Sequence, residues 1–98
     1  MRSSEQRSSG GKPLKRDFAL TEEFFDDLEY WIIQDPGVAR RLLRLMRVTI
    51  RDPFHGIGKP EPLKGTDGYW SRRLTSEHRF VYRVTPTALI CVKGRFHY

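Results

Sequence analysis

Hydrophobic positions recur with a helical period in the first half of the chain. Between residues 21 and 34 they fall three and four apart, which predicts an amphipathic helix with Thr21 as its N-cap and glutamates in its first turn. The apolar face of this helix consists of Phe24, Phe25, Leu28, Trp31 and Ile32. A second helix is predicted from about Pro36 to Asp52, where a proline follows. Its apolar face consists of Val38, Leu42, Leu45, Met46 and Thr49.

The second half of the chain changes to a period of two, which is typical of strands. A stretch rich in glycine and proline comes first, from Pro53 to Gly68, and predicts a long loop of the kind that is often functional. Three strands follow at 69–75, 79–84 and 88–97, and their short connections predict an antiparallel meander. The alternation within 79–84 predicts one face that packs on the helices and one basic, open face. The first contains Phe80, Tyr82 and Val84, and the second contains Arg79, Val81 and Arg83.

These elements predict an α+β fold in a single domain. Two N-terminal helices would pack on one face of a mostly antiparallel sheet in the order β-α-α-β-β-β, if residues 15–20 form a first short strand. We expect the domain to span residues 15–98, because residues 1–14 are rich in serine and glycine and predict a disordered extension. The single Cys91 lies in an apolar run and is expected to be a small buried hydrophobe.

The expected location of the protein is the cytoplasm. No segment approaches the ~18 consecutive apolar residues that a membrane helix needs. The basic N-terminal stretch lacks the apolar region of a secretory signal.

Charge is distributed very unevenly along the chain. Residues 1–16 carry +4, residues 17–35 carry −7 and residues 36–98 carry +9, for a net charge of +6. A strongly basic body on one small domain favours a polyanionic partner, most plausibly nucleic acid. A basic protein without such a partner is the alternative that composition leaves open.

Four arginines form a row on the second predicted helix, opposite its apolar face. This arginine ridge consists of Arg40, Arg44, Arg47 and Arg51. One interpretation is a helix face that simply meets water. The other is a contact with a polyanion or with an acidic protein, because four aligned cations repel one another and a negatively charged partner relieves that repulsion.

The Pro-rich loop contains a candidate for acid–base chemistry. RNA cleavage without a metal needs a base for the 2′-hydroxyl, a cation for the phosphorane and an acid for the leaving oxygen. Glu61 lies between Pro60 and Pro62, which restrict its backbone, and Lys59 and Lys64 flank it. An exposed loop acid without a function is the alternative for Glu61.

Cationic and proton-transferring residues occur on the predicted strands as well. Arg73 and Arg79 lie on either side of the first strand turn, and a period of two places Arg95 and His97 on one face of the last strand. The alternatives are structural: an ion pair of Arg79 with Glu77 or Asp67, and an idle chain end at His97. The residues expected to serve structure rather than chemistry are His78 at the turn, Trp70 and Phe96.

Four motifs occur in order along this part of the chain. They are Gly58-Lys59-Pro60-Glu61-Pro62-Leu63-Lys64, Trp70-Ser71-Arg72-Arg73, Glu77-His78-Arg79-Phe80-Val81-Tyr82 and Arg95-Phe96-His97-Tyr98. Together they closely resemble the YoeB toxins of the RelE/ParE superfamily of bacterial toxin–antitoxin modules, over about residues 16–98. The resemblance implies a microbial-ribonuclease-like fold, a homodimer, and cleavage of mRNA in the ribosomal A site that halts translation. It also implies an antitoxin such as YefM as the partner that masks the site.

The resemblance further implies roles for individual residues. Glu61 matches the general base, Arg79 the arginine that stabilises the transition state, and His97 the general acid. Tyr98 matches the last aromatic residue of the site. The residues expected to bind RNA or stabilise charge are Lys59, Lys64, Arg73 and Arg95. No metal or other cofactor is expected; a gyrase-inhibiting ParE-like toxin and a basic RNA-binding module without chemistry are the alternative functions.

Overall fold

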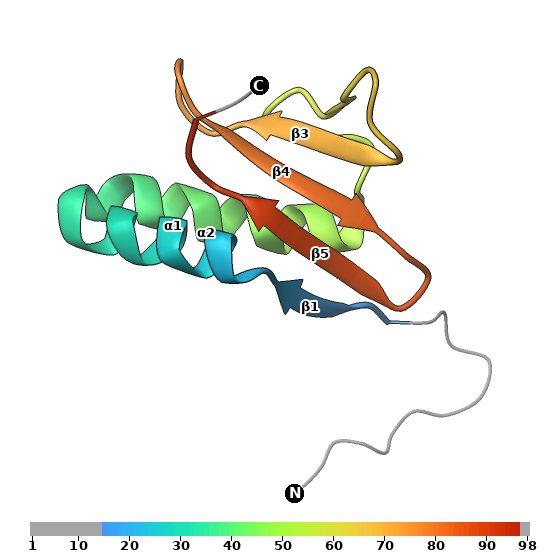
Figure 1. The fold of residues 1–98 in the computed structure, drawn as a ribbon, viewed down its shortest axis with the longest axis horizontal. Coiled ribbons are helices and arrows are strands. Elements are labelled where there is room, and N and C mark those ends of the chain that lie inside the picture. Colours follow the sequence, from blue (N-terminus) through green and yellow to red (C-terminus); the bar gives the residue numbers. More distant parts are fainter. Residues whose placement is uncertain (1–14, 97–98) are drawn as a thin grey trace, which may run out of the picture.

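Two helices cover one face of a five-stranded sheet in the computed structural model, which describes residues 15–96 (Figure 1). The elements are β1 (Asp17–Leu20), α1 (Glu22–Gln34), α2 (Pro36–Arg51), β2 (Glu61–Pro62), β3 (Tyr69–Arg73), β4 (Arg79–Val84) and β5 (Ala88–Lys93). The predicted α+β fold is therefore confirmed, with both helices before the meander. None of the helices in the described part is long and apolar enough to cross a membrane.

The sheet has the strand order β1-β5-β4-β3-β2. β1 runs parallel to β5, and the other neighbours are antiparallel, so the sheet is mostly antiparallel as predicted. The short β2 was not expected, because we predicted a loop over its residues. It pairs Glu61 with Ser71 and Pro62 with Trp70 at the edge of the sheet, where a proline removes no interior hydrogen bond.

The first helix begins as predicted but buries a different face. The Thr21 hydroxyl accepts the Phe24 N–H at 3.0 Å and so caps the helix. Phe25 and Ile32, which we expected in the core, are 56% and 54% exposed. The acidic Asp27 is buried instead, because the contact with α2 and β5 turns the stripe 24, 27, 28 and 31 inward.

The second helix and the middle strand supply most of the core. The predicted apolar face of α2 is confirmed, since Leu42, Leu45 and Thr49 are fully buried and Val38 packs against the core. On β4, Phe80 and Tyr82 are fully buried among these side chains, again as predicted. Cys91 is buried as well, and desolvation raises the pKa of its thiol to about 12.

The outer face of the sheet, opposite the helices, is less open than the alternation suggested. Arg83 is exposed on this face, but Val81 and its cross-strand partner Ser71 are both fully buried. The prediction of a uniformly open basic face was therefore wrong at its centre.

The last strand ends earlier than predicted. β5 stops at Lys93, and its pairing with β4 contains a bulge, since Val81 pairs with Lys93 while Tyr82 pairs with Cys91. The period of two does not continue past this point. The expectation that Arg95 lies on a regular strand face was therefore wrong.

Candidate functional site

A hollow of about 550 Å³ lies at the end of the outer sheet face, beside the connection between β3 and β4. It is lined by Glu61, Leu63, Arg73, Thr75, Ser76, Glu77 and Arg79. Three of the predicted site residues thus meet here from three strands: Glu61 from β2, Arg73 from β3 and Arg79 from β4. Glu61 and Arg79 are far apart in the sequence. Two arginines and two glutamates contribute to this lining, so most of its residues are charged.

Glu61 and Arg79 form an ion pair across the hollow. The Arg79 Nη1 atom lies 3.2 Å from Glu61 Oε2 and also donates to Ser71 Oγ at 3.3 Å. The Glu61 side chain is 53% exposed and that of Arg79 is 23% exposed, so the carboxylate remains open to a ligand. The alternative pairing of Arg79 with Glu77 or Asp67 is not what the structure shows.

A second arginine stands directly opposite the first. Arg73 on β3 pairs in register with Arg79 on β4, and like charges at directly opposed positions destabilise a sheet. Arg79 is partly compensated by Glu61, whereas the exposed Arg73 side chain borders the hollow and has no ion-pair partner among residues 15–96. A bound anion such as a phosphate would neutralise this pair of cations.

The two lysines that flank Glu61 in the sequence lie outside the lining of the hollow. Lys59 and Lys64 are both exposed. Lys59 has a φ of 51°, a left-handed conformation that is uncommon for a residue other than glycine. The turn at this residue brings the chain into the short strand that presents Glu61.

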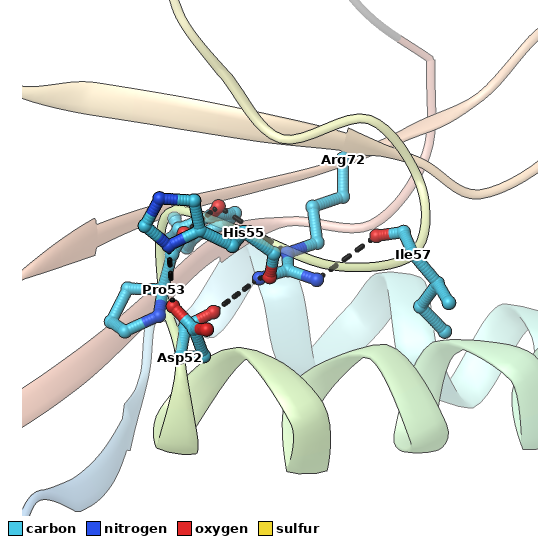
Figure 2. A network of polar contacts seen from close by, with 6 residues as sticks. Asp52, Pro53, His55, Ile57 and Arg72 are labelled. Atoms are coloured by element: carbon cyan, nitrogen blue, oxygen red, sulfur yellow. Dashed lines mark hydrogen bonds and ion pairs between the residues drawn. The ribbon is translucent and has the colours of Figure 1, made fainter.

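A buried arginine that the sequence reasoning missed holds the loop before Glu61 in place. Arg72 is fully buried and reaches from β3 into the loop, where it donates to the backbone carbonyls of Asp52, His55 and Ile57 (Figure 2). It also approaches the Tyr82 hydroxyl at 3.4 Å. These contacts fix the segment that leads to Glu61.

The alternation of β3 contained the signal for this role. The period of two places Arg72 on the same face as Trp70 and Leu74, so it was predictable as an inward-pointing arginine. Gly58 is fitted to the same arrangement: its φ is +82°, and an added Cβ would lie 3.1 Å from Arg72 Cβ. The Arg73 N–H donates to the Gly58 carbonyl at 2.6 Å and joins the loop directly to β3.

Arg95 does not join the hollow. Its guanidinium lies over the Tyr30 ring of α1, 3.6 Å from the ring centroid, and 4.6 Å from the centroid of Phe96. Phe96, which we expected to serve structure rather than chemistry, is 59% exposed. His97 and Tyr98 lie outside the described residues.

The arginine ridge is likewise separate from the hollow. All four of its arginines are exposed on α2, whose buried face packs against the sheet from the other side. A neighbouring arginine that we had not singled out, Arg41, donates to the carbonyls of Leu74 and Arg73 and so joins α2 to the end of β3.

Known proteins are similar to this chain in sequence and in fold. A family model described as the YoeB-like toxin of bacterial type II toxin–antitoxin systems matches residues 20–98. A "Toxin YoeB" from Streptomyces coelicolor is 47% identical over 80 residues, which cover 81% of this chain and 95% of that protein.

Solved structures agree with the sequence comparison. The YoeB dimer from Staphylococcus aureus superimposes with a TM-score of 0.79 at 31% identity, over 89% of this chain and 100% of that one. In the YoeB–YefM heterotetramer from the same organism, the matching chain gives a TM-score of 0.76 at 31% identity, over 86% of this chain and 99% of that one. The chain therefore belongs to the YoeB-like family of toxins from bacterial type II toxin–antitoxin systems.

Proposed function

We propose that this toxin is an endoribonuclease that cleaves mRNA in the ribosomal A site and thereby inhibits translation. The observation that carries the proposal is the Glu61–Arg79 ion pair in a hollow that also holds Arg73. A carboxylate beside two cations supplies the base and the charge stabilisation that acid–base cleavage at a phosphate requires.

Glu61 acts as the general base in this proposal. Its carboxylate takes the proton of the 2′-hydroxyl, and the 2′-oxygen attacks the adjacent phosphorus. The bond from phosphorus to the 5′-oxygen breaks, which leaves a 2′,3′-cyclic phosphate on one fragment. His97 donates a proton to the departing 5′-oxygen, and Tyr98 completes the site as its final aromatic residue. The reaction needs no metal.

Arg79 and Arg73 stabilise the negative charge that develops on the phosphate. The contacts of Arg79 to Glu61 and Ser71 both use Nη1. A guanidinium has five N–H donors, so the Nη2 and Nε groups of Arg79 remain for the phosphate oxygens. Lys59, Lys64 and Arg95 attract the RNA backbone from outside the hollow.

The partners that we propose follow from the family and from charge. A YefM-like antitoxin and a second copy of the chain are the expected protein partners, since the Staphylococcus aureus relatives were solved as a dimer and as a YoeB–YefM complex. The arginine ridge would attract acidic segments of the antitoxin or of the ribosome. The proposed location is the cytoplasm, where translated mRNA is found.

Primer extension on a translated message, with and without ribosomes, tests the proposed reaction. The wild type should produce new 5′ ends only when the message is translated. Glu61→Gln and His97→Gln should each reduce cleavage by about 10²–10⁴-fold, the usual contribution of one acid–base group. The matched control is Asp67→Asn, which changes an exposed acid outside the hollow and should leave cleavage unchanged.

Two results would contradict the proposal. One is translation arrest by Glu61→Gln at the wild-type level, which would show that the carboxylate is not needed. The other is an absence of new 5′ ends with the wild type. A parallel supercoiling assay with DNA gyrase then distinguishes a ParE-like inhibitor from an RNA-binding module without chemistry.

A further inference from the structure

The backbone of Phe96 is held by two consecutive residues, the last of the β3–β4 connection and the first of β4. Its N–H donates to His78 Nδ1 at 2.7 Å, and its carbonyl accepts the N–H of Arg79 at 3.0 Å. To accept this hydrogen bond, the Nδ1 atom of His78 must carry no proton, so the ring is the neutral tautomer with its proton on Nε2. The backbone of Phe96 is thus fixed by one side chain and one backbone group.

Phe96 has an unusual conformation that needs such support. Its φ is 58°, a left-handed value that few residues other than glycine adopt, and its side chain is largely exposed. Burial of the ring therefore does not explain why the strained backbone persists. Strained residues of this kind gather at functional sites, where the surrounding structure holds them in place.

His78 is itself held in one position from several directions. Its ring meets the Trp31 ring edge-on, with 4.9 Å between the ring centroids. Its backbone N–H donates to Thr75 Oγ1 at 3.1 Å. Its carbonyl accepts the N–H groups of Leu74 and Thr75 at 2.9 and 3.1 Å. The acceptor that meets Phe96 is therefore preorganised by both α1 and the turn.

The same turn connects Phe96 to the hollow. Arg79 uses its backbone N–H for Phe96 and its side chain for Glu61. His97 follows Phe96 directly in the chain, so the backbone of Phe96 determines where the proposed general acid begins. A small displacement at this point changes the distance between the proposed acid and the proposed base.

We propose that His78 is a positioning residue: its neutral imidazole holds the Phe96 N–H and so sets the place of the terminal residues relative to Glu61 and Arg79. This inference rests on the proposed ribonuclease function and adds to it a residue that does not touch the RNA. Misplacing a reacting group by about 1 Å costs about 100-fold in rate. That is the loss that we expect when the acceptor is removed.

Two substitutions of the same residue separate the acceptor from the ring. His78→Asn places an amide oxygen near the position of Nδ1 and should keep the hydrogen bond, whereas His78→Leu removes the acceptor but keeps an apolar side chain. The control is His55→Leu, because His55 is exposed in the loop after α2 and lies outside the hollow. Melting temperatures identify any variant that fails to fold.

The variants are compared in two independent measurements. Amide exchange at Phe96, followed by NMR on the free protein, reports the hydrogen bond without any RNA. Single-turnover cleavage on programmed ribosomes, over a range of toxin concentrations, separates the maximal rate from half-saturation. We expect His78→Leu to speed Phe96 exchange by about tenfold, as the loss of one hydrogen bond implies. Its maximal rate should fall by about 100-fold at unchanged half-saturation, and His78→Asn and His55→Leu should behave like the wild type.

Each other outcome overturns the proposal or identifies its failing part. If His78→Leu frees the Phe96 amide but cleaves at the wild-type rate, the clamp does not position the site. If His78→Asn keeps the amide protected and still loses cleavage, His78 acts in another way. If the wild type cleaves no RNA, the proposed function fails and the positioning role fails with it, while the exchange data still show whether the clamp exists.

Discussion

Replacing Arg72 with lysine should weaken the fold and the site together. The arginine is fully buried, and its guanidinium satisfies three backbone carbonyls of the loop after α2 (Figure 2). A lysine keeps the positive charge but has one nitrogen in place of a planar fork, so it cannot reach all three carbonyls. The change therefore tests the geometry of the guanidinium rather than its charge.

The size of the effect follows from the carbonyls that lose their donor. A buried polar group without a partner costs about 1–3 kcal/mol. If the lysine reaches only one of the three carbonyls, two remain unpaired. Because water has some access to the loop, we expect the free energy of unfolding to fall by about 2–4 kcal/mol. In a domain of this size, a loss of 1 kcal/mol lowers the melting temperature by roughly 4–8 °C, so Arg72→Lys should melt roughly 10–30 °C below the wild type.

Thermal unfolding followed by circular dichroism measures this shift. The matched control is Arg83→Lys, because Arg83 lies exposed on the neighbouring strand, where substitutions usually change stability by less than about 0.5 kcal/mol. Cleavage should fall along with stability, since the same loop leads to Glu61. A melting temperature of Arg72→Lys within about 4 °C of the wild type would refute the reasoning, because the three carbonyls would then not depend on the fork.

Four further expectations concern other parts of the molecule. Burial raises the pKa of the Asp27 carboxyl above its unfolded value of 3.8, so the wild type should lose stability as the pH rises from 3.8 through the raised pKa. Asp27→Asn should abolish that loss, which urea unfolding at a series of pH values from 3.8 upward can measure. Gly94→Ala should lower stability by about 1–3 kcal/mol, because the new Cβ would lie 2.9 Å from Leu42 Cδ2; an unchanged urea midpoint would argue against this contact. The thiol of Cys91, whose pKa is raised to about 12, should react with a thiol reagent at pH 8 only after unfolding, as a chromogenic assay in and out of denaturant can show. Replacing the arginine ridge with glutamines should slow association with an acidic antitoxin by about tenfold at low salt and leave dissociation nearly unchanged, and a wild-type association rate that does not vary with salt would contradict this steering.

The local periods of the sequence predicted the helices and the long strands because these elements depend on neighbouring residues. The N-cap at Thr21 and the inward face of α2 are decided by contacts within one or two turns, and both predictions were confirmed. The pairing of Glu61 with Arg79 was harder, since it depends on a two-residue strand that no period reveals. The residue types nevertheless identified both partners.

The failures concern polar residues whose surroundings come from distant parts of the chain. Arg72 and Asp27 are both charged. The hydrophobic pattern therefore did not assign Asp27 to the interior, and the inward position that the alternation of β3 gives Arg72 was not recognised. Their burial depends on backbone partners far away in the sequence: the loop carbonyls for Arg72, and the Gly94 N–H at 2.9 Å for Asp27. The exposure of Phe25 has the same origin, because the position of α2 and β5 decided which side of α1 turned inward.

The acidic first helix thus has a role that its charge alone did not suggest. It supplies the buried Asp27 carboxylate that accepts the Gly94 N–H, and the Trp31 Nε1–H that donates to the Gly94 carbonyl at 2.8 Å. Both contacts fix the backbone just beyond β5, two residues before the strained Phe96. Because Trp31 also contacts the His78 ring, one face of α1 supports Gly94 directly and Phe96 through His78. The residues after β5 no longer have regular strand pairing, and side chains of α1, from the N-terminal part of the domain, therefore keep Gly94 in place.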